Sequence, residues 1–269
     1  MGLPKKSYKK NSDIVPELTT VLSFSGGLSS ARMLSLWGNA VDHVIFANTG
    51  KEHPGTLDFV RDCEQHFNIP IVWVEYCPEN KFKVVTYETA SRKGEPFAAL
   101  IKKRSYLPNV VTRFCTTELK IRPMKSYLKS IGVRAKDVEM MIGIRADEKS
   151  RYDRNKGIAK GIGWDRVMPL YEKGITKGDV NLFWDTMPFT LNINNYEGNC
   201  DLCFLKGKSK RLKVLQNNPS AADWWIEQEE LRQNTFEKRV KVSELLHMAM
   251  TQTMIPFEDD DVDCYCTID

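Results

Sequence analysis

The chain has 269 residues, of which 42% are hydrophobic and 28% are charged, a composition that is ordinary for a globular protein. No apolar run approaches the ~20 residues that span a membrane, and the N-terminal segment lacks the apolar core of a signal peptide. We therefore expect a cytoplasmic protein without a membrane partner. The net charge of +4 conceals an asymmetry, because residues 258–269 carry six acidic side chains and neither Lys nor Arg. The remaining surplus of basic residues would attract polyanions such as nucleotides or nucleic acid, and a solvated basic surface is the alternative that charge alone leaves open.

Strand-like and helix-like patterns alternate along most of the chain, which predicts an α/β fold with a doubly wound, mostly parallel sheet. The expected strands are 19–25, 43–48, 71–75 and 138–144. The expected helices are 29–36, 55–67, 96–101, 118–131 and a short helix that opens at the capping box of Thr176 and Asp179. The polar stretches 79–94 and 149–163 are expected to be loops, the second lying over a site.

The composition changes after Pro188, where several Asn and Gly residues lead into a cysteine pair. Helical patterns return at 206–216 and 221–231. We therefore divide the chain into four parts: a basic arm at 1–17, a main domain at 18–187, a smaller helical region at 188–257 and an acidic tail at 258–269.

Distinctive residues follow three of the expected strands. Ser25-Gly-Gly-Leu-Ser-Ser30 joins the first strand to the first helix, which directs backbone N–H groups and the positive end of a helix at one point and suits phosphate. Asn48-Thr-Gly50 follows the second strand and Gly143–Glu148 follows the last. Ligands of open parallel sheets lie at the carboxyl ends of the strands, so we expect all three segments to converge on one crevice.

These segments carry a resemblance to a known family. Ser25–Ser30 resembles the PP-loop of the N-type ATP pyrophosphatases, while Asn48–Gly50, Arg113–Lys120 and Gly143–Glu148 are similar to segments of the phosphoadenosine phosphosulfate (PAPS) reductase family. The resemblance implies a Rossmann-like fold that binds ATP or an adenylyl sulfate (PAPS or APS), with Mg²⁺ in the relatives that cleave ATP between its α and β phosphates. The cofactor-binding residues it implies are Ser25, Gly26, Gly27, Ser29, Ser30, Asn48, Thr49, Gly50, Arg145 and Arg151. The catalytic residues it implies are Cys115, Lys120 and Arg145.

The loop departs from the family pattern at Leu28 and Ser29, where Lys and Asp are common, and Asn48 replaces an Asp. Loss of the Lys removes a charge near the phosphates, and loss of the Asp removes a metal ligand. A degenerate loop or an altered nucleotide preference is therefore open. Five cations are available to supply the missing charge: Arg32, Lys51, Lys120, Arg145 and Arg151.

Seven cysteines, an odd number unevenly placed, argue against a secreted disulfide framework. Cys200 and Cys203 have the spacing of a metal clip. The resemblance adds Cys115 as a third ligand, since related thiolation enzymes hold a [4Fe–4S] cluster with cysteines distributed in this way. Zinc is the alternative metal, and packing as small hydrophobic residues is the alternative without metal. Cys264 and Cys266 on the acidic tail are expected to be part of a disordered end, and a redox nucleophile or a fourth cluster ligand is the alternative role for them.

Three functions remain open from the sequence. In the first, ATP adenylates an acceptor such as a nucleobase, and cluster-bound sulfur displaces AMP, with a sulfur or electron donor protein as partner. The basic segment 206–213 would hold the nucleic-acid backbone, unless it is a solvated helix face. In the second, a thiol reduces an adenylyl sulfate. In the third, the protein binds a nucleotide or nucleic acid without catalysis. The three cysteines and the missing C-terminal Glu-Cys-Gly-x-His signature favour the first.

Overall fold

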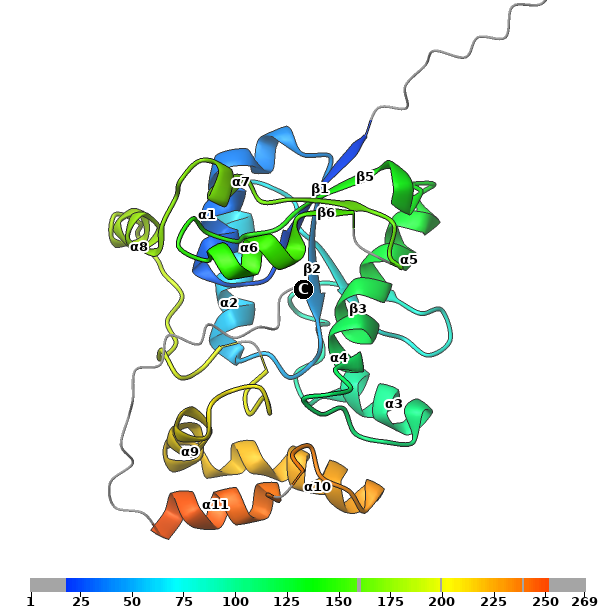
Figure 1. Cartoon of the computed structure of the whole chain (residues 1–269), viewed down its shortest axis with the longest axis vertical. Coiled ribbons are helices and arrows are strands. Elements are labelled where there is room, and N and C mark those ends of the chain that lie inside the picture. Colours follow the sequence, from blue (N-terminus) through cyan, green and yellow to red (C-terminus); the bar gives the residue numbers. More distant parts are fainter. Residues whose placement is uncertain (1–17, 159–160, 199, 239, 252–269) are drawn as a thin grey trace, which may run out of the picture.

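A computed structural model of the chain describes residues 18–158, 161–198, 200–238 and 240–251. The basic arm and the acidic tail, with Cys264 and Cys266, lie outside the described residues. In the described part of the chain seven strands form one sheet in the order β4-β3-β2-β1-β5-β7-β6 (Figure 1). The strands are β1 (Thr19–Phe24), β2 (His43–Asn48), β3 (Val72–Glu75), β4 (Lys83–Val85), β5 (Val138–Met141), β6 (Gly157–Ile158) and β7 (Asp165–Val167).

The inner part of the sheet is parallel, as the alternation of patterns predicted. β1 pairs in parallel with β2 and β5, β2 with β3, and β5 with β7. The edge strands β4 and β6 are antiparallel to their neighbours. The chain runs outward from β1 to β3 and then returns to the other side of β1 for β5. This reversal creates a topological switch point between β1 and β5, where open α/β sheets hold their ligands.

Helices of ordinary length connect and cover these strands. The α-helices are α1 (Leu28–Trp37), α2 (Pro54–Phe67), α3 (Glu95–Arg104), α4 (Phe114–Thr116), α5 (Arg122–Ser130), α6 (Lys149–Asn155), α7 (Pro169–Glu172), α8 (Lys177–Asp185), α9 (Lys208–Asn217), α10 (Asp223–Arg232) and α11 (Val242–Thr251). The short 3-10 helices are η1 (Gly38–Ala40), η3 (Ala135–Asp137) and η4 (Pro219–Ala222), and a π-helical segment, η2 (Thr117–Ile121), continues α4 into α5.

Successive strand residues feed two hydrophobic layers, because side chains alternate between the faces of a sheet. Leu22 and Phe24 of β1 pack on one face with residues of α1, α2 and α8. Val21 of β1 packs on the other face with residues of α5. Figure 1 shows α1, α2 and α8 on one side of the strands and α5 on the other. Burial on both faces explains why these strands are almost entirely apolar.

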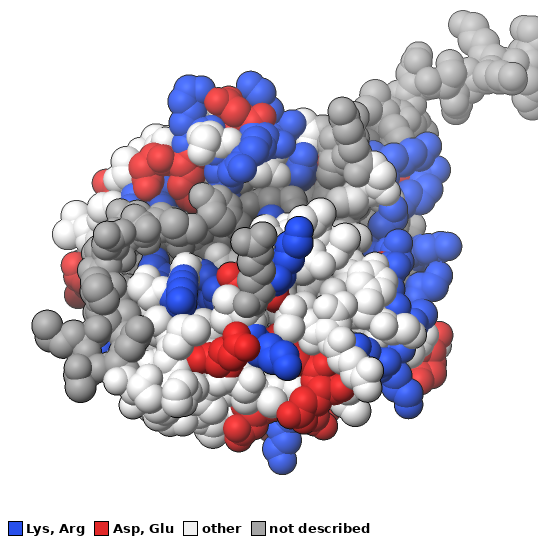
Figure 2. Space-filling view, turned by 60° about the horizontal axis from the view of Figure 1, so that its bottom comes forward, with Lys and Arg blue, Asp and Glu red and all other residues white. Residues whose placement is uncertain are grey.

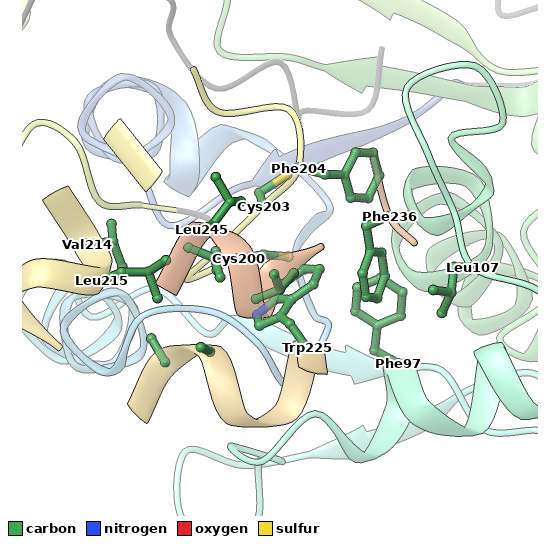
Figure 3. Packing of buried hydrophobic residues seen from close by; sticks show 14 of the residues in the cluster. Phe97, Leu107, Cys200, Cys203, Phe204, Val214, Leu215, Trp225, Phe236 and Leu245 are labelled. Carbon is green, nitrogen blue, oxygen red and sulfur yellow. The ribbon is translucent and has the colours of Figure 1, made fainter. Parts of the chain in front are cut away.

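The C-terminal helices α9, α10 and α11 lie together below the sheet in Figure 1. They share a third hydrophobic cluster with α3, in which Phe97 and Leu100 meet Trp225, Phe236 and Leu245 (Figure 3). This cluster joins the helical region to the main domain. The division near residue 188 stays a prediction. None of the described helices is both long and apolar enough to cross a membrane.

Two polar stretches expected to be loops contain regular structure instead. The stretch 149–163 forms α6 and β6, and α6 is supported by ion pairs between Lys149 and Asp153 and between Arg151 and Glu148. Such pairs three and four residues apart stabilise a helix that has little apolar character. The stretch 79–94 contributes β4, an exposed edge strand whose pattern is too short to recognise. The capping box of Thr176 and Asp179 is present at the start of α8.

Candidate functional site

The turn between β1 and α1 is closed by its own serines. Ser30 donates its hydroxyl proton to the Gly27 carbonyl (2.9 Å) and accepts the Ser25 backbone N–H (3.2 Å). Ser30 has no second proton, so the 2.9 Å contact between the two hydroxyls is a donation from Ser25. Gly26 has φ +77°, and a Cβ placed there would lie 2.6 Å from the Thr56 methyl group. The loop shape therefore depends on glycine at this position.

The N-terminus of α1 is open to an anion. Gly27 is its N-cap and supplies no side-chain hydrogen bond, and the first helical turn contains no acidic residue. The first N–H groups of a helix have no partner within the helix, and they carry the positive end of its dipole. Leu28, the first residue of α1, packs against the core, and its carbonyl accepts the Trp184 indole N–H at 3.1 Å. Leu28 thus anchors the loop instead of contributing a charge.

Arg145 brings positive charge to this loop from the segment after β5. Its Nη1 donates to the Ser29 hydroxyl at 3.0 Å, and its side chain also pairs with Asp147 at 3.1 Å. Burial acts to raise the pKa of Asp147, but the hydrogen bond and charge of Arg145 outweigh it and lower that pKa. Gly143 permits the approach, because a Cβ there would lie 3.1 Å from the Ser30 backbone. Ser29, an unusual residue for the loop, is thus the contact point for an arginine.

Glu148 holds two arginines beside the loop. Its Oε2 accepts the Arg145 backbone N–H at 2.9 Å, and its Oε1 pairs with Arg151 Nη1 at 2.5 Å. All three residues are nearly buried, so the ion pairs are shielded from water and fix the guanidinium groups in place. Glu148 therefore links the Gly143–Glu148 segment to α6 and holds both arginines beside the loop.

These elements enclose a cavity of about 480 Å³ at the switch point. Six cationic side chains line it, namely Lys120, Arg145, Arg151, Lys177, Lys206 and Lys210. Glu197 is the one carboxylate among the described residues that line it. In Figure 2 Lys and Arg side chains stand beside the hollow near the centre of this face, with some Asp and Glu side chains next to them. The excess of positive charge makes the cavity suited to a polyanion.

One of the lining cations, Lys177, was not predicted from the sequence, whereas Lys206 and Lys210 belong to the basic segment that was proposed to hold a nucleic-acid backbone. Lys177 is the first residue of α8, directly after the capping Thr176. Lys206 and Lys210 reach the cavity from the C-terminal region. Lys206 is buried and donates to the Asp201 carbonyl at 2.9 Å, and a contact of the basic segment 206–213 with nucleic acid stays a prediction. The sequence shows that this segment is basic, but it does not show that Lys206 and Lys210 point toward the cavity.

The Asn48-Thr-Gly50 turn lies at the end of β2, but it is not among the residues that line the cavity. Asn48 is fully buried and donates to Glu75 (2.7 Å) and to the Ser91 carbonyl (2.8 Å). Thr49 gives both its backbone N–H and its hydroxyl to Glu52. These polar groups hold the turn in place. Their contact with a nucleotide stays a prediction.

Of the five cations proposed to replace the missing loop lysine, Lys120, Arg145 and Arg151 line the cavity. Arg32 lies over the Phe183 ring at 4.0 Å, where burial lowers the pKa of its guanidinium. Lys51 pairs with Asp201 at 2.7 Å. Arg145 contacts the loop directly through Ser29, and its role as a substitute for the missing lysine stays a prediction.

The three cysteines predicted to bind metal share one hydrophobic cluster. Cys200 and Cys203 are buried in it (Figure 3), and Cys115 packs against it. Burial raises the pKa of the Cys115 thiol against the lowering effect of Lys120 and Arg113. Within the described ranges no three His, Cys, Asp or Glu side chains are grouped to hold a metal ion. The described residues therefore present no preformed metal site, so the cluster and Mg²⁺ stay predictions and no chemical step below uses them.

The sequence profile of the phosphoadenosine phosphosulfate reductase domain matches residues 19–187. The chain belongs to this family. An uncharacterized nin region protein of Escherichia phage lambda, ORF290, is 34% identical over 208 residues, which cover 72% of this chain and 68% of the phage protein. An uncharacterized Methanocaldococcus jannaschii protein, MJ0066, is 29% identical over 64% of this chain and 32% of its own length. Among solved structures, PAPS reductase from Candida auris in a phosphate complex covers 66% of this chain and 77% of its own, with 19% identity and a TM-score of 0.42.

Proposed function

We propose that this member of the PAPS reductase family is an enzyme that binds an adenine nucleotide in the crevice, with the phosphates against Ser25–Ser30. One observation carries the proposal: an uncapped helix N-terminus and Arg145 meet in a cavity with six cations and one carboxylate. Backbone N–H groups at a helix N-terminus are suited to phosphate oxygens, and Arg145 adds a planar donor.

The walls of the cavity provide for the adenosine as well. Phe24, Ala47, Met124 and Ile142 supply apolar surface next to the loop. A nucleotide site of this kind needs mostly apolar walls and a few fixed polar groups. The lysines of the C-terminal region lie on the same cavity, so they are available to a second anionic group on the nucleotide or on its acceptor.

For the reaction we favour adenylation followed by sulfur transfer. An oxygen of the acceptor, such as a nucleobase carbonyl, attacks the α-phosphorus of ATP, the bond to the β-phosphate oxygen breaks, and pyrophosphate leaves. A sulfur nucleophile supplied by a donor then displaces AMP from the acceptor. Arg145 balances charge that develops on the phosphates. Lys120 also lines the cavity, and its ammonium group lies 3.8 Å from the buried Glu52 carboxylate.

Reduction of an adenylyl sulfate is the second candidate, and the family match supports it. A thiolate would attack the sulfur of the sulfate, releasing the nucleotide, and a second thiol would then release sulfite and form a disulfide. The raised pKa of the Cys115 thiol counts against Cys115 as this thiolate. We therefore rank this reaction second.

Product analysis separates these functions. The protein is incubated with ATP, Mg²⁺ and sodium sulfide as the sulfur donor together with bulk tRNA or short DNA, and separately with PAPS and dithiothreitol. We expect AMP and pyrophosphate in the first incubation, at least about tenfold less with Arg145→Gln, and no change with Arg134→Gln, an exposed arginine outside the cavity. Sulfite formed from PAPS alone would reverse the ranking. Tight nucleotide binding with no product would support the non-catalytic alternative.

The predicted cluster has its own test. We expect protein purified without oxygen to contain iron and sulfide, and Cys200→Ala to lose them. Cys63→Ala is the matched control, because Cys63 is buried as well but lies in the hydrophobic core that contains α1 and α2. Iron retained in full by Cys200→Ala would overturn the ligand assignment, and zinc without sulfide would replace the cluster by the alternative metal.

A further inference from the structure

A basic surface, the α3–α4 face, surrounds the connection between these two helices. Its residues, 102–122, carry six Lys or Arg side chains and a single acidic one, Glu118. Lys102 and Lys103 are exposed in the last turn of α3. Figure 1 shows α3, α4 and α5 on the right-hand side of the molecule, and in Figure 2 Lys and Arg are more numerous than Asp and Glu along that side. The α3–α4 face therefore attracts an anionic partner.

Two arginines of this face share one carboxylate. Glu118 is buried and pairs with both Arg104 and Arg122, the latter at 2.8 Å. The pairing leaves one positive charge in excess, and the Arg122 and Arg104 side chains stay 59% and 36% exposed. A guanidinium group has five N–H donors, so each arginine is held by Glu118 and keeps donors for a second anion.

Tyr106 gives the face an aromatic surface. Its ring meets the Phe114 ring edge to face, with 4.8 Å between the centroids, and the Arg104 guanidinium lies 5.6 Å from the Phe114 centroid. These contacts hold the Tyr106 ring, while 39% of the residue is exposed. A fixed aromatic ring among cations is the arrangement on which unpaired bases stack.

The loop between α3 and α4 also presents apolar side chains. Val110 and Val111 are 58% and 90% exposed. The Asn109 side-chain oxygen accepts the backbone N–H groups of Val111 and Thr112, both at 2.9 Å, so the turn is held in shape while its valines are exposed. A base or a sugar can cover such apolar surface, whereas an inorganic anion cannot. The mixture of cations with apolar and aromatic groups therefore favours a nucleic-acid strand over free phosphate.

We propose that single-stranded nucleic acid binds the α3–α4 face. An unpaired base stacks on Tyr106, and Lys102, Lys103 and Arg122 hold the neighbouring phosphates. The bases of a duplex are stacked on one another and cannot reach the ring, so the face selects single strands. Binding to this face does not depend on the reaction in the crevice.

The α3–α4 face leads into the crevice. Phe114 begins α4, and the π-helical segment η2 that follows carries Lys120, which lines the cavity. Six residues of helix span on the order of 10 Å, the length of a few nucleotides in a strand. A base near the one on Tyr106 thus comes within reach of the crevice, an extension that rests on the proposed function.

Oligonucleotide binding to the full chain without ATP tests the proposal. Fluorescence anisotropy compares oligothymidylate, oligouridylate and a DNA duplex, each of about 12 nucleotides per strand. We expect one of the single strands to bind at least about tenfold more tightly than the duplex, and the tighter strand identifies the preferred sugar. An oligoglutamate of about the same charge is a polyanion without bases, and it should compete at least about tenfold more weakly than the strand.

Two sets of variants assign the binding to this face. Lys102→Gln/Lys103→Gln should weaken the strand at least about fivefold at about 100 mM salt and lower the slope of log affinity against log salt by about 1.4, because each phosphate contact contributes about 0.7. Lys156→Gln/Lys173→Gln is the matched control, since it removes two exposed lysines at the ends of α6 and α7. Tyr106→Ala should weaken the strand at least about fivefold with the slope unchanged, whereas Tyr106→Phe keeps the ring and should stay within about twofold of wild type.

Circular dichroism verifies that each variant is folded, and the lysine pair, on the surface, remains decisive if Tyr106→Ala is not. Equal affinity for strand and duplex, or an unchanged affinity of the lysine pair, would overturn the proposal, and equal competition by oligoglutamate would replace nucleic acid by an acidic polypeptide. Loss of binding with Lys208→Gln, an exposed residue of the basic segment 206–213, but not with the lysine pair of α3 would place the strand on that segment instead. Protein that binds the strands but forms no AMP or pyrophosphate would refute the proposed reaction and leave the α3–α4 face in place.

Discussion

Replacing Gly26 by alanine perturbs the loop at the position where its backbone is most constrained. The residue has φ +77°, and an added Cβ would lie 2.6 Å from Thr56 Cγ2 and 3.2 Å from Val60 Cγ2. Both contacts come from α2, which is packed in the core and has no room to move away. The substitution therefore forces either the loop or the helix to shift.

The expected cost combines two terms. A left-handed backbone costs a residue with a Cβ about 1–2 kcal/mol, and overpacking in a core costs about 1–3 kcal/mol. Alanine also restricts the unfolded chain more than glycine does, which stabilises the folded state by about 0.5 kcal/mol. We expect Gly26→Ala to lower the free energy of unfolding by about 2–4 kcal/mol, which corresponds to a fall in Tm of about 5–12 °C for a chain of this size.

Gly27→Ala is the matched control. Its φ is −101°, and an added Cβ would meet Ser25 Oγ at 3.7 Å, an ordinary contact. Loss of glycine at a helix N-cap costs no more than about 1 kcal/mol. Urea unfolding of both variants measures the difference directly. A Gly26→Ala protein as stable as wild type, or two variants destabilised equally, would refute the described loop geometry.

Buried groups elsewhere give three further tests. Burial raises the pKa of Glu229, so the folded carboxyl keeps a proton that the unfolded chain has lost. The free energy of unfolding of the wild type relative to Glu229→Gln, measured by urea titration, should therefore fall as the pH rises from about 4 toward neutrality. Burial also raises the pKa of the Cys63 thiol, and mass spectrometry after iodoacetamide at pH 8 should find Cys77 alkylated at least about tenfold faster. Trp184→Phe removes the hydrogen bond to the Leu28 carbonyl and should cost about 1 kcal/mol in urea unfolding. A stability difference for Glu229→Gln that does not depend on pH would contradict the first expectation. Alkylation of Cys63 faster than Cys77 would contradict the second, and a Trp184→Phe protein as stable as wild type would contradict the third.

The central strands and the phosphate loop were predictable because their signals are local. β2 begins and ends at His43 and Asn48, as its apolar run indicates, and α2 follows at Pro54. The glycine turn at Ser25–Ser30 joins a strand to a helix as expected. Since parallel strands end at one edge, the convergence of Arg145 with this loop also followed from the order of the elements.

Other parts of the site depend on contacts between residues far apart in the sequence. The amide of Asn48 is turned toward Glu75 and Ser91, and neither partner is marked by any nearby pattern. Lys206 and Lys210 reach the cavity because the C-terminal helices pack against α3, which requires the shape of the hydrophobic cluster. The helix α6 was missed because ion pairs, rather than an apolar stripe, support it.

Nucleotide affinity measured by calorimetry tests most directly whether the crevice is a phosphate site. The titrations compare ATP, PAPS and adenosine on the wild type, Arg145→Gln and the exposed control Arg134→Gln. We predict that the wild type and the control bind at least one of the two phosphorylated nucleotides far more tightly than adenosine, and that Arg145→Gln binds it at least about tenfold more weakly, because a hydrogen bond to a charged group contributes about 1.5–3 kcal/mol. Equal affinity of Arg145→Gln and wild type, or equal affinity for adenosine and both nucleotides, would contradict the proposed site.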